Sequence, residues 1–105
     1  EVAALTPDMA ALASLENWAI IVTAPGDHCD FVSRFFAPGH GIDEDPVTGS
    51  AHCTLIPYWS DRLGKDQMIA RQISARGGEL HCRNQGDRVA IAGRAHEVLV
   101  GEFLL

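Results

Sequence analysis

One stretch of helical periodicity, over residues 49–63, constrains the fold of this chain more than any other sequence feature. Leu55, Trp59 and Leu63 recur there at helical spacing, and Gly64 follows as a C-terminal cap. The rest of the chain consists mainly of short apolar runs that turn-forming residues interrupt. We therefore predict a helix over residues 49–63 whose apolar side is buried by a surrounding sheet.

Several short apolar runs have the composition of β-strands. Two precede the helix, and the first is rich in β-branched residues, which is typical of a strand buried on both faces. The others follow the helix at short, regular spacing, which predicts an antiparallel meander. The expected strands cover residues 18–23, 32–36, 68–75, 80–83, 88–92 and 97–104, and a short helix over residues 7–15 with Thr6 as its N-cap precedes them. The pattern predicts an α+β domain with a curled, mostly antiparallel sheet around a central helix.

Composition and charge exclude several classes of protein. Hydrophobic residues make up 47% and charged residues 21% of the 105 residues, which is ordinary for one folded domain. The formal net charge of -6 and the scattered basic residues disfavour nucleic-acid binding. The longest apolar stretches, such as residues 18–22, are far shorter than the ~20 residues that span a bilayer, and no leader sequence opens the chain. We expect neither nucleic acid nor a membrane as a partner.

Three cysteines bear on both compartment and metal binding. Their odd number and the lack of a C-x-x-C motif favour free thiols in a reducing compartment, so we expect the cytoplasm. Each cysteine follows a histidine, and both residue types bind zinc or copper. Adjacent side chains on a strand point to opposite faces, so one such pair seldom supplies two ligands to one ion. We expect no metal site, and a metal sensor is the third-ranked alternative; the pairs are His28-Cys29, His52-Cys53 and His81-Cys82.

Residues 39–49, at the start of the predicted helix, are rich in turn formers and have no helical period, so we predict a loop there. Pro46 restricts the backbone of Asp45, whose carboxylate should project from the loop in a defined direction. Thr48 can act as the helix N-cap, and Gly49 and Ser50 leave N–H groups open at the positive end of the helix. This junction would suit a substrate carboxylate or phosphate. The alternative is that the acidic residues only complement the helix dipole.

Longer runs of residues are far more specific than these local patterns. The central run passes without a gap from Glu44 to Cys53 and reads Glu-Asp-Pro-Val-Thr-Gly-Ser-Ala-His-Cys. Together with its flanking runs, it resembles the signature of the PhzF-like phenazine-biosynthesis family, and the resemblance spans most of the chain. The flanking runs are Leu5-Thr6-Pro7-Asp8, Arg34-Phe35-Phe36-Ala37-Pro38, Gly41-Ile42, Pro57-Tyr58-Trp59, Leu63-Gly64, Gln72 and Arg76-Gly77-Gly78.

The resemblance implies a fold and a place for the chain within it. The family has the diaminopimelate epimerase-like fold, in which two similar lobes each wrap a curled sheet around a central helix. The substrate lies in the cleft between the lobes. Residues 1–105 then correspond to part of the C-terminal lobe, and the N-terminal lobe is absent from the chain. We expect the missing lobe as a partner, and self-association into a homo-oligomer through an exposed, apolar cleft face.

The resemblance also implies roles for particular residues. Asp45 and Ser50 match positions that line the cleft and hydrogen-bond the substrate, with Asp45 orienting the substrate or assisting proton transfer. Gly49 with Ser50 matches the helix N-terminus that faces a substrate carboxylate. The family's main proton-shuttling glutamate and its partner histidine lie in the other lobe, so His52 receives no such role. The family needs no metal, flavin or nicotinamide, because tuned carboxylates can move a proton.

These implications lead to two hypotheses about function. The first is that the chain forms the C-terminal part of a cofactor-independent isomerase or epimerase that moves a proton on a small carboxylate-bearing substrate. The chain alone would then be inactive, because the second acid–base group and the second wall of the cleft are missing. The second hypothesis is a non-catalytic domain that binds a small molecule, an anion or another protein. Proton exchange restored by adding the missing lobe would separate the two.

Overall fold

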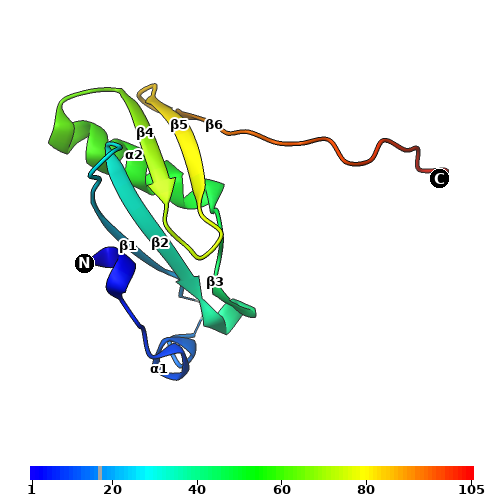
Figure 1. Cartoon of the computed structure of the whole chain (residues 1–105), viewed down its shortest axis with the longest axis horizontal. Coiled ribbons are helices and arrows are strands. Elements are labelled where there is room, and N and C mark those ends of the chain that lie inside the picture. The colour runs from blue at the N-terminus through cyan, green and yellow to red at the C-terminus, as the bar shows by residue number, and fades with distance from the viewer. Residues whose placement is uncertain (17) are drawn as a thin grey trace.

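The described part of the chain, residues 1–16 and 18–105 of a computed structural model, contains six strands and four helical segments (Figure 1). The strands are β1 (Ile20–Pro25), β2 (Phe31–Ala37), β3 (Ile42–Glu44), β4 (Gln67–Gln72), β5 (Gly78–Asn84) and β6 (Val89–Ala92); the helical segments are η1 (Val2–Ala4), α1 (Met9–Ala13), η2 (Pro38–His40) and α2 (Gly49–Leu63). The sheet order is β1-β2-β4-β5-β6, and β3 pairs with β2 off this path. β2 and β4 run parallel, whereas the other pairs are antiparallel, so the α+β, mostly antiparallel prediction is confirmed.

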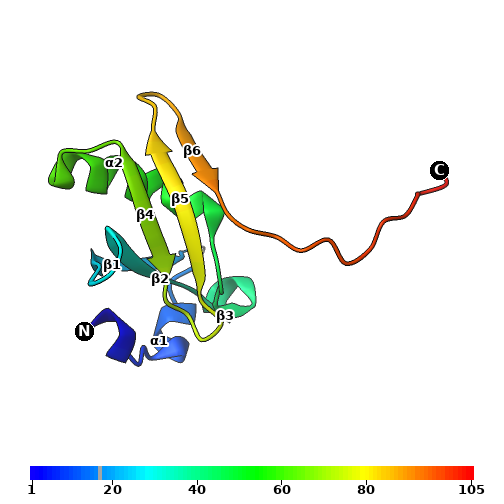
Figure 2. The same cartoon turned by 45° about the horizontal axis from the view of Figure 1, so that its top comes forward.

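Helix α2 begins and ends at the residues that the sequence predicts, Gly49 and Leu63. Gly64 adopts the left-handed conformation (φ 65°) and its N–H donates to the Ser60 carbonyl, which ends the helix. The helix packs against one face of the sheet and forms the crossover that lets β4 run parallel to β2 (Figure 2). In the part of the chain that the structure describes, no helix is long and apolar enough to cross a membrane.

The core lies between α2 and the sheet. Phe31 of β2 pairs with Ala70 of β4, and the Phe31 ring stacks on the Trp59 ring of α2 with 5.7 Å between the ring centroids. The Trp59 indole N–H donates to Thr23 Oγ1 (2.9 Å), which ties β1 to the same helix. The main buried cluster consists of Phe31, Ala51, Leu55, Ile56, Trp59, Met68, Ala70, Leu80 and Cys82.

Three local predictions are wrong in detail. α1 is shorter than residues 7–15, and its N-cap is Asp8 rather than Thr6, because the Asp8 carboxylate accepts a hydrogen bond from the Ala11 N–H (3.0 Å). β1 begins at Ile20 and is half-buried instead of buried on both faces, since it lies at the edge of the sheet. β4 ends at Gln72, before the predicted end of that strand at residue 75.

The segment over residues 39–49, predicted to be a loop, contains a short strand. β3 pairs antiparallel with β2, and the register shifts between Phe36 and Ala37. Such an irregularity bends the longer strand and lets a short piece of a turn-rich segment pair with it. The sequence pattern misses this strand because its 3 residues are too few to show a periodic alternation.

Residues 97–104, predicted to be the last strand, form no strand in the structure. After β6 the chain leaves the sheet and extends away from the domain as the red segment of Figure 1. Strand-forming residues need a hydrogen-bonded neighbour and a surface to pack on. Among residues 1–16 and 18–105, none of the strand pairs includes this segment, so the prediction of a further strand in this sheet is wrong.

Candidate anion-binding site at the start of helix α2

Asp45 lies between β3 and α2, and its backbone is anchored to the sheet. Its N–H donates to the Phe35 carbonyl of β2 (2.9 Å). Its carboxylate Oδ2 accepts a hydrogen bond from the Thr48 hydroxyl (2.5 Å), whereas Oδ1 accepts none from the residues that the structure describes. Asp45 is partly exposed, so a ligand can approach this residue from solvent.

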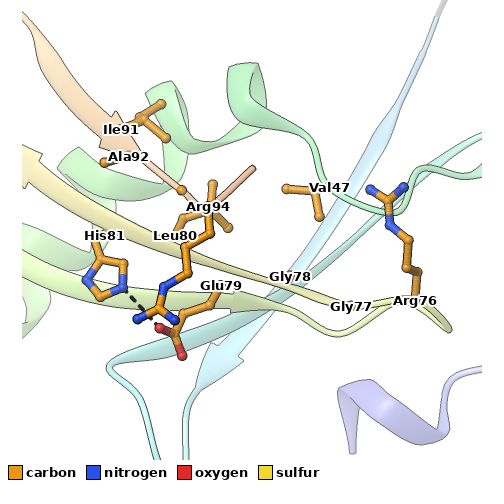
Figure 3. Close-up of a pocket in the computed structure, with 11 residues that line it drawn as sticks. Val47, Arg76, Gly77, Gly78, Glu79, Leu80, His81, Ile91, Ala92 and Arg94 are labelled. Atoms are coloured by element: carbon orange, nitrogen blue, oxygen red, sulfur yellow. Dashed lines mark hydrogen bonds and ion pairs between the residues drawn. The ribbon is translucent and has the colours of Figure 1, made fainter. Parts of the chain in front are cut away.

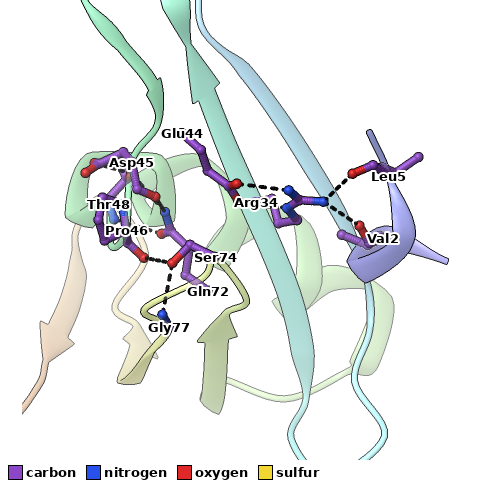
Figure 4. Close-up of polar contacts among 10 residues, drawn as sticks. All are labelled: Val2, Leu5, Arg34, Glu44, Asp45, Pro46, Thr48, Gln72, Ser74 and Gly77. Atoms are coloured by element: carbon purple, nitrogen blue, oxygen red, sulfur yellow. Dashed lines mark hydrogen bonds and ion pairs between the residues drawn. The ribbon is translucent and has the colours of Figure 1, made fainter. Parts of the chain in front are cut away.

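Gln72 of β4 holds the same loop from inside the domain (Figure 4). Its side chain is only 1% exposed. Oε1 accepts from the Thr48 N–H (2.7 Å), and Nε2 donates to the Asp45 carbonyl (2.8 Å) and to Thr48 Oγ1 (3.0 Å). Because this amide donates to the Thr48 oxygen, the hydroxyl proton is left to point at the Asp45 carboxylate. One buried amide therefore fixes both the loop and the direction of its hydrogen bond to Asp45.

The N-terminus of α2 is open. Thr48 occupies the predicted N-cap position, but its hydroxyl does not cap the helix, because it is engaged with Asp45 and Gln72. Gly49 and Ser50 are exposed, and a Cβ at Gly49 would meet no atom within 4 Å. The first turn carries no acidic residue. The positive end of a 15-residue helix thus faces solvent beside Asp45, which suits an anion.

Glu44, the neighbour of Asp45, belongs to an ion pair that joins three parts of the chain (Figure 4). Arg34 donates two hydrogen bonds to its carboxylate, from Nε to Oε1 (2.7 Å) and from Nη2 to Oε2 (2.9 Å). Arg34 Nη1 donates to the carbonyls of Val2 (3.2 Å) and Leu5 (2.8 Å). Hydrogen bonding to Glu44 raises the pKa of Arg34. Both oxygens of Glu44 accept hydrogen bonds from Arg34, whereas only one oxygen of Asp45 accepts a hydrogen bond among the described residues.

The turn after β4 supports the loop from the other side. The Ser74 hydroxyl donates to the Pro46 carbonyl (2.8 Å) and accepts from the Gly77 N–H (3.0 Å). A Cβ on Gly78 would overlap the Val47 side chain, so only glycine fits this close approach. These contacts explain two residues of the Arg76-Gly77-Gly78 run: the Gly77 N–H binds Ser74, and Gly78 leaves room for Val47.

His52 lies in the interior, away from the open helix terminus. It is fully buried, and its ring is 6.0 Å from the Phe31 ring between centroids. Nδ1 lies 2.8 Å from the Thr48 carbonyl, which can only accept, so Nδ1 carries the proton. Nε2 has no partner among the described residues, and burial lowers the pKa of His52. The side chain therefore acts as a neutral core residue.

Sequence reasoning missed the positions of Gln72 and Ser74 in this network. Gln72 entered only as part of the family resemblance. The alternation along β4 could have drawn attention to it, because Met68, Ala70 and Gln72 all point inward. A polar residue at an inward position indicates a buried hydrogen-bond network.

The three cysteines occupy different environments. Cys53 is exposed on α2, and Cys82 is buried in the core; burial raises the pKa of Cys82 to about 11. Cys29 is partly buried, and its thiol donates to the Phe31 carbonyl (3.3 Å). Residues 1–16 and 18–105 contain no group of three or more His, Cys, Asp or Glu that could hold a metal ion.

A hollow of about 530 Å³ lies beside this junction, along β5 and the end of β6 (Figure 3). Val47 lines it together with the exposed Arg76 and Arg94. On its wall, His81 and Glu79 form a hydrogen bond (3.0 Å). The three predicted site residues do not line this hollow. They lie together on an open surface at the start of α2 instead.

Comparisons with known proteins agree on one family. The family model described as phenazine biosynthesis-like protein matches residues 1–101. An uncharacterized isomerase of Pseudomonas aeruginosa is 62% identical over 104 residues, which cover 99% of this chain and 40% of that protein. A PhzF-family crystal structure from Enterococcus faecalis gives a TM-score of 0.84 at 53% identity, over 88% of this chain and 36% of that one. A PhzC/PhzF crystal structure from Clostridium difficile gives 0.86 at 46% identity, over 99% and 40%.

Proposed function

Because the chain belongs to the phenazine biosynthesis-like (PhzC-PhzF) family, we propose that it is part of a cofactor-independent isomerase or epimerase. It has the diaminopimelate epimerase-like fold of that family over the part that it spans. The proposed reaction moves a proton on a small substrate that carries a carboxylate. The observation that carries this proposal is the junction before α2, where a clamped carboxylate lies beside an open helix N-terminus.

Asp45 is the proposed acid–base or substrate-orienting group. Its backbone is fixed by Phe35 and Gln72, so the carboxylate is held in place before a substrate binds. One oxygen accepts from Thr48, and the other is available to a substrate proton or hydroxyl. A carboxylate held in this way loses little conformational freedom on binding, which favours a catalytic role.

Gly49 and Ser50 are the proposed carboxylate-binding group. First-turn N–H groups lack partners within a helix, and here the Thr48 side chain does not cap them and Gly49 and Ser50 are exposed. The Ser50 hydroxyl, exposed at the same place, adds a further donor. A substrate carboxylate bound there would place the adjacent carbon near Asp45, where a proton can be exchanged.

The remaining catalytic parts belong to a longer polypeptide. The chain spans about 40% of the length of the curated relatives it matches. Proton transfer across a cleft needs an acid on one side and a base on the other, and Glu44 and His52 are already committed to structural contacts. We propose that the second group comes from the part that this chain does not span, and that the chain alone does not catalyse.

A test uses the complete two-lobed protein in heavy water with candidate cyclic dienoic acids or amino acids. Asp45→Asn should lower the rate of deuterium exchange about 10²-fold, the usual scale for an acid–base group. Asp43→Asn, at an exposed neighbouring position, is the matched control and should leave the rate unchanged. Wild-type exchange by Asp45→Asn, or exchange by this chain alone, would contradict the proposal.

A non-catalytic anion-binding domain is the second candidate. It is favoured by one observation: Glu44 and His52, two titratable neighbours of Asp45, are paired or buried. Calorimetry with small carboxylates and the exchange assay separate the candidates. Binding without exchange in the complete protein would favour the second.

The proposed setting of this function is the cytoplasm, in a small-molecule biosynthetic process. Free thiols at Cys29, Cys53 and Cys82 are compatible with a reducing compartment. Self-association into a homo-oligomer is also proposed, and analytical ultracentrifugation of the complete protein would measure it.

A further inference from the structure

The side-chain amide of Gln72 has one possible orientation, because two backbone groups bind its two ends (Figure 4). The Thr48 N–H can only donate, so the atom that it contacts at 2.7 Å is the amide oxygen Oε1. The Asp45 carbonyl can only accept, so the atom that it contacts at 2.8 Å is the amide nitrogen Nε2. Gln72 is 1% exposed, and its amide cannot turn over without breaking both hydrogen bonds.

This orientation determines what the Thr48 hydroxyl can do. Gln72 Nε2 also contacts Thr48 Oγ1 at 3.0 Å, and an amide nitrogen donates but does not accept. The hydroxyl therefore accepts from Gln72 and directs its own proton elsewhere. Among the described residues, the acceptor within reach of that proton is Asp45 Oδ2, at 2.5 Å. A chain of donors thus runs from the buried amide of β4 to the partly exposed carboxylate of Asp45.

The chain of donors gives the Asp45 carboxylate a fixed polarity. Thr48 is only 7% exposed, so its hydrogen bonds lie in a poorly hydrated setting, where hydrogen bonds in series strengthen one another. A hydroxyl that points at a carboxylate oxygen makes a charge-assisted hydrogen bond with it. A proton on Oδ2 would instead face the proton of the Thr48 hydroxyl. Asp45 is therefore held as an acceptor of hydrogen bonds before a substrate arrives.

We propose that Gln72 is a positioning residue of the proposed reaction, which acts through the Thr48 hydroxyl and holds Asp45 as the acceptor of a substrate proton. In that step the substrate C–H bond breaks, its proton passes to the Asp45 carboxylate, and its electron pair stays on the substrate. Gln72 itself lies inside the domain and does not touch the substrate. This inference rests on the proposed function, and it adds the direction in which the proton first moves and the buried residue that sets this direction.

The test measures deuterium exchange by Gln72→Glu in the complete two-lobed protein, with cyclic dienoic acids or amino acids in heavy water. The new carboxylate has no N–H, so it cannot donate to the Thr48 hydroxyl and competes with Asp45 for the hydroxyl proton. kcat should fall about tenfold or more, which is the scale of one lost hydrogen bond to a charged group. KM should stay within about twofold, since the hydrogen bonds of Gln72 do not involve the helix terminus proposed to bind the substrate.

Gln85→Glu is the matched control. It makes the same substitution and adds the same charge at an exposed position in the turn between β5 and β6. Neither kcat nor KM should change. Circular dichroism checks that each variant folds.

A double-mutant cycle shows whether Gln72 acts through Thr48. Gln72→Glu is compared in the wild type and in Thr48→Val, where no hydroxyl proton remains to be diverted. In the valine background it should lower kcat less than about threefold, because only its hydrogen bond to the Asp45 carbonyl is then lost. Gln72→Met, which has a similar length and no donor, replaces Gln72→Glu in the cycle if that variant does not fold, and the same pattern is expected.

The outcomes separate this inference from the proposed function. A fall in kcat that is equal in the two backgrounds would overturn the inference, because Gln72 would then act independently of the Thr48 hydroxyl. Equal kcat for Gln72→Glu and Gln85→Glu would also overturn it, while the proposed function would stand. Absence of exchange by the wild-type protein, or wild-type exchange by Asp45→Asn, would overturn the proposed function and this inference with it.

Discussion

The loop before α2 and the exposed, apolar C-terminal tail (residues 97–105) differ in whether their residues have partners elsewhere in the described chain. Residues 45–48 are polar and turn-rich, yet the buried Gln72 and the carbonyl of Phe35 hold them in one conformation. Residues 97–105 include several residues of strong strand propensity, yet they form no strand and pair with none of the described strands. Local propensity therefore decides neither conformation. The presence or absence of a partner elsewhere in the chain decides both.

The difference also separates two ways of presenting side chains. The proposed proton transfer needs a carboxylate placed before the substrate arrives, and the loop before α2 holds Asp45 in this way. Residues 97–105 instead leave their large apolar side chains exposed. The comparison can be tested by removing the clamp, the hydrogen bond to Asp45, the buried histidine and the tail in turn.

The largest effect is expected from Gln72→Ala. This change removes three hydrogen bonds and leaves the buried Thr48 N–H without an acceptor. It should lower the free energy of unfolding by about 3 kcal/mol, as one or two unsatisfied buried groups and a small cavity do. Urea denaturation followed by circular dichroism measures it, with the exposed neighbour Arg71→Ala as the control. Equal urea midpoints for the two variants would show that the hydrogen bonds between Gln72 and the loop contribute no stability.

A smaller effect is expected from Thr48→Val, which keeps the shape of the side chain and removes its hydroxyl. Asp45 then loses its donor and Gln72 Nε2 loses one of its two acceptors, while the Thr48 backbone N–H still reaches Gln72. Proton exchange by the complete protein should fall about tenfold, which corresponds to about 1.4 kcal/mol of barrier. Thr48→Ser, which restores the hydroxyl, should recover most of the rate. Equal rates for the valine and serine variants would show that the Thr48 hydroxyl does not contribute to the reaction and that this side chain only packs.

The elements that the sequence predicts well are those with local signals. The bounds of α2 follow from the spacing of Leu55 and Trp59 and from the left-handed Gly64. The meander of β4, β5 and β6 follows from turns between neighbouring strands. The parallel pairing of β2 with β4 could not be predicted in this way, because the paired residues Phe31 and Ala70 lie far apart in sequence.

For the site, sequence placed Asp45, Gly49 and Ser50 together because they are near neighbours in one run. It did not show that Thr48 turns its hydroxyl away from the helix, because that direction depends on Gln72 in another element. A role that a residue has only through a partner far away in the sequence cannot be seen in a local sequence pattern.

A pH effect on the core is expected from His52. Its pKa is lowered in the folded chain from the ordinary 6.5, mainly by burial, so the unfolded chain binds the proton more tightly. The stabilising contribution is fully present above pH 6.5 and is lost as the pH falls toward the folded pKa. Between pH 6.5 and the folded pKa, the free energy of unfolding should drop by about 1.4 kcal/mol per pH unit, which urea titrations at several pH values measure. His52→Phe should flatten the dependence of the unfolding free energy on pH in this range. An unchanged slope would show that groups other than His52 cause the dependence.

The smallest effect is expected from removing the tail. Deletion of residues 97–105 takes away six large apolar side chains that are at least 78% exposed, and none of them belongs to the core cluster. The free energy of unfolding should change by less than about 0.5 kcal/mol, as for substitutions on a free surface. The deletion should also raise the solubility of the isolated chain, since it removes the exposed apolar segment. Urea denaturation of the shortened chain beside Gln72→Ala compares the two regions directly. A loss comparable to that of Gln72→Ala would mean that the tail packs on its own domain in solution, and the contrast between a clamped loop and an unpartnered strand would fail.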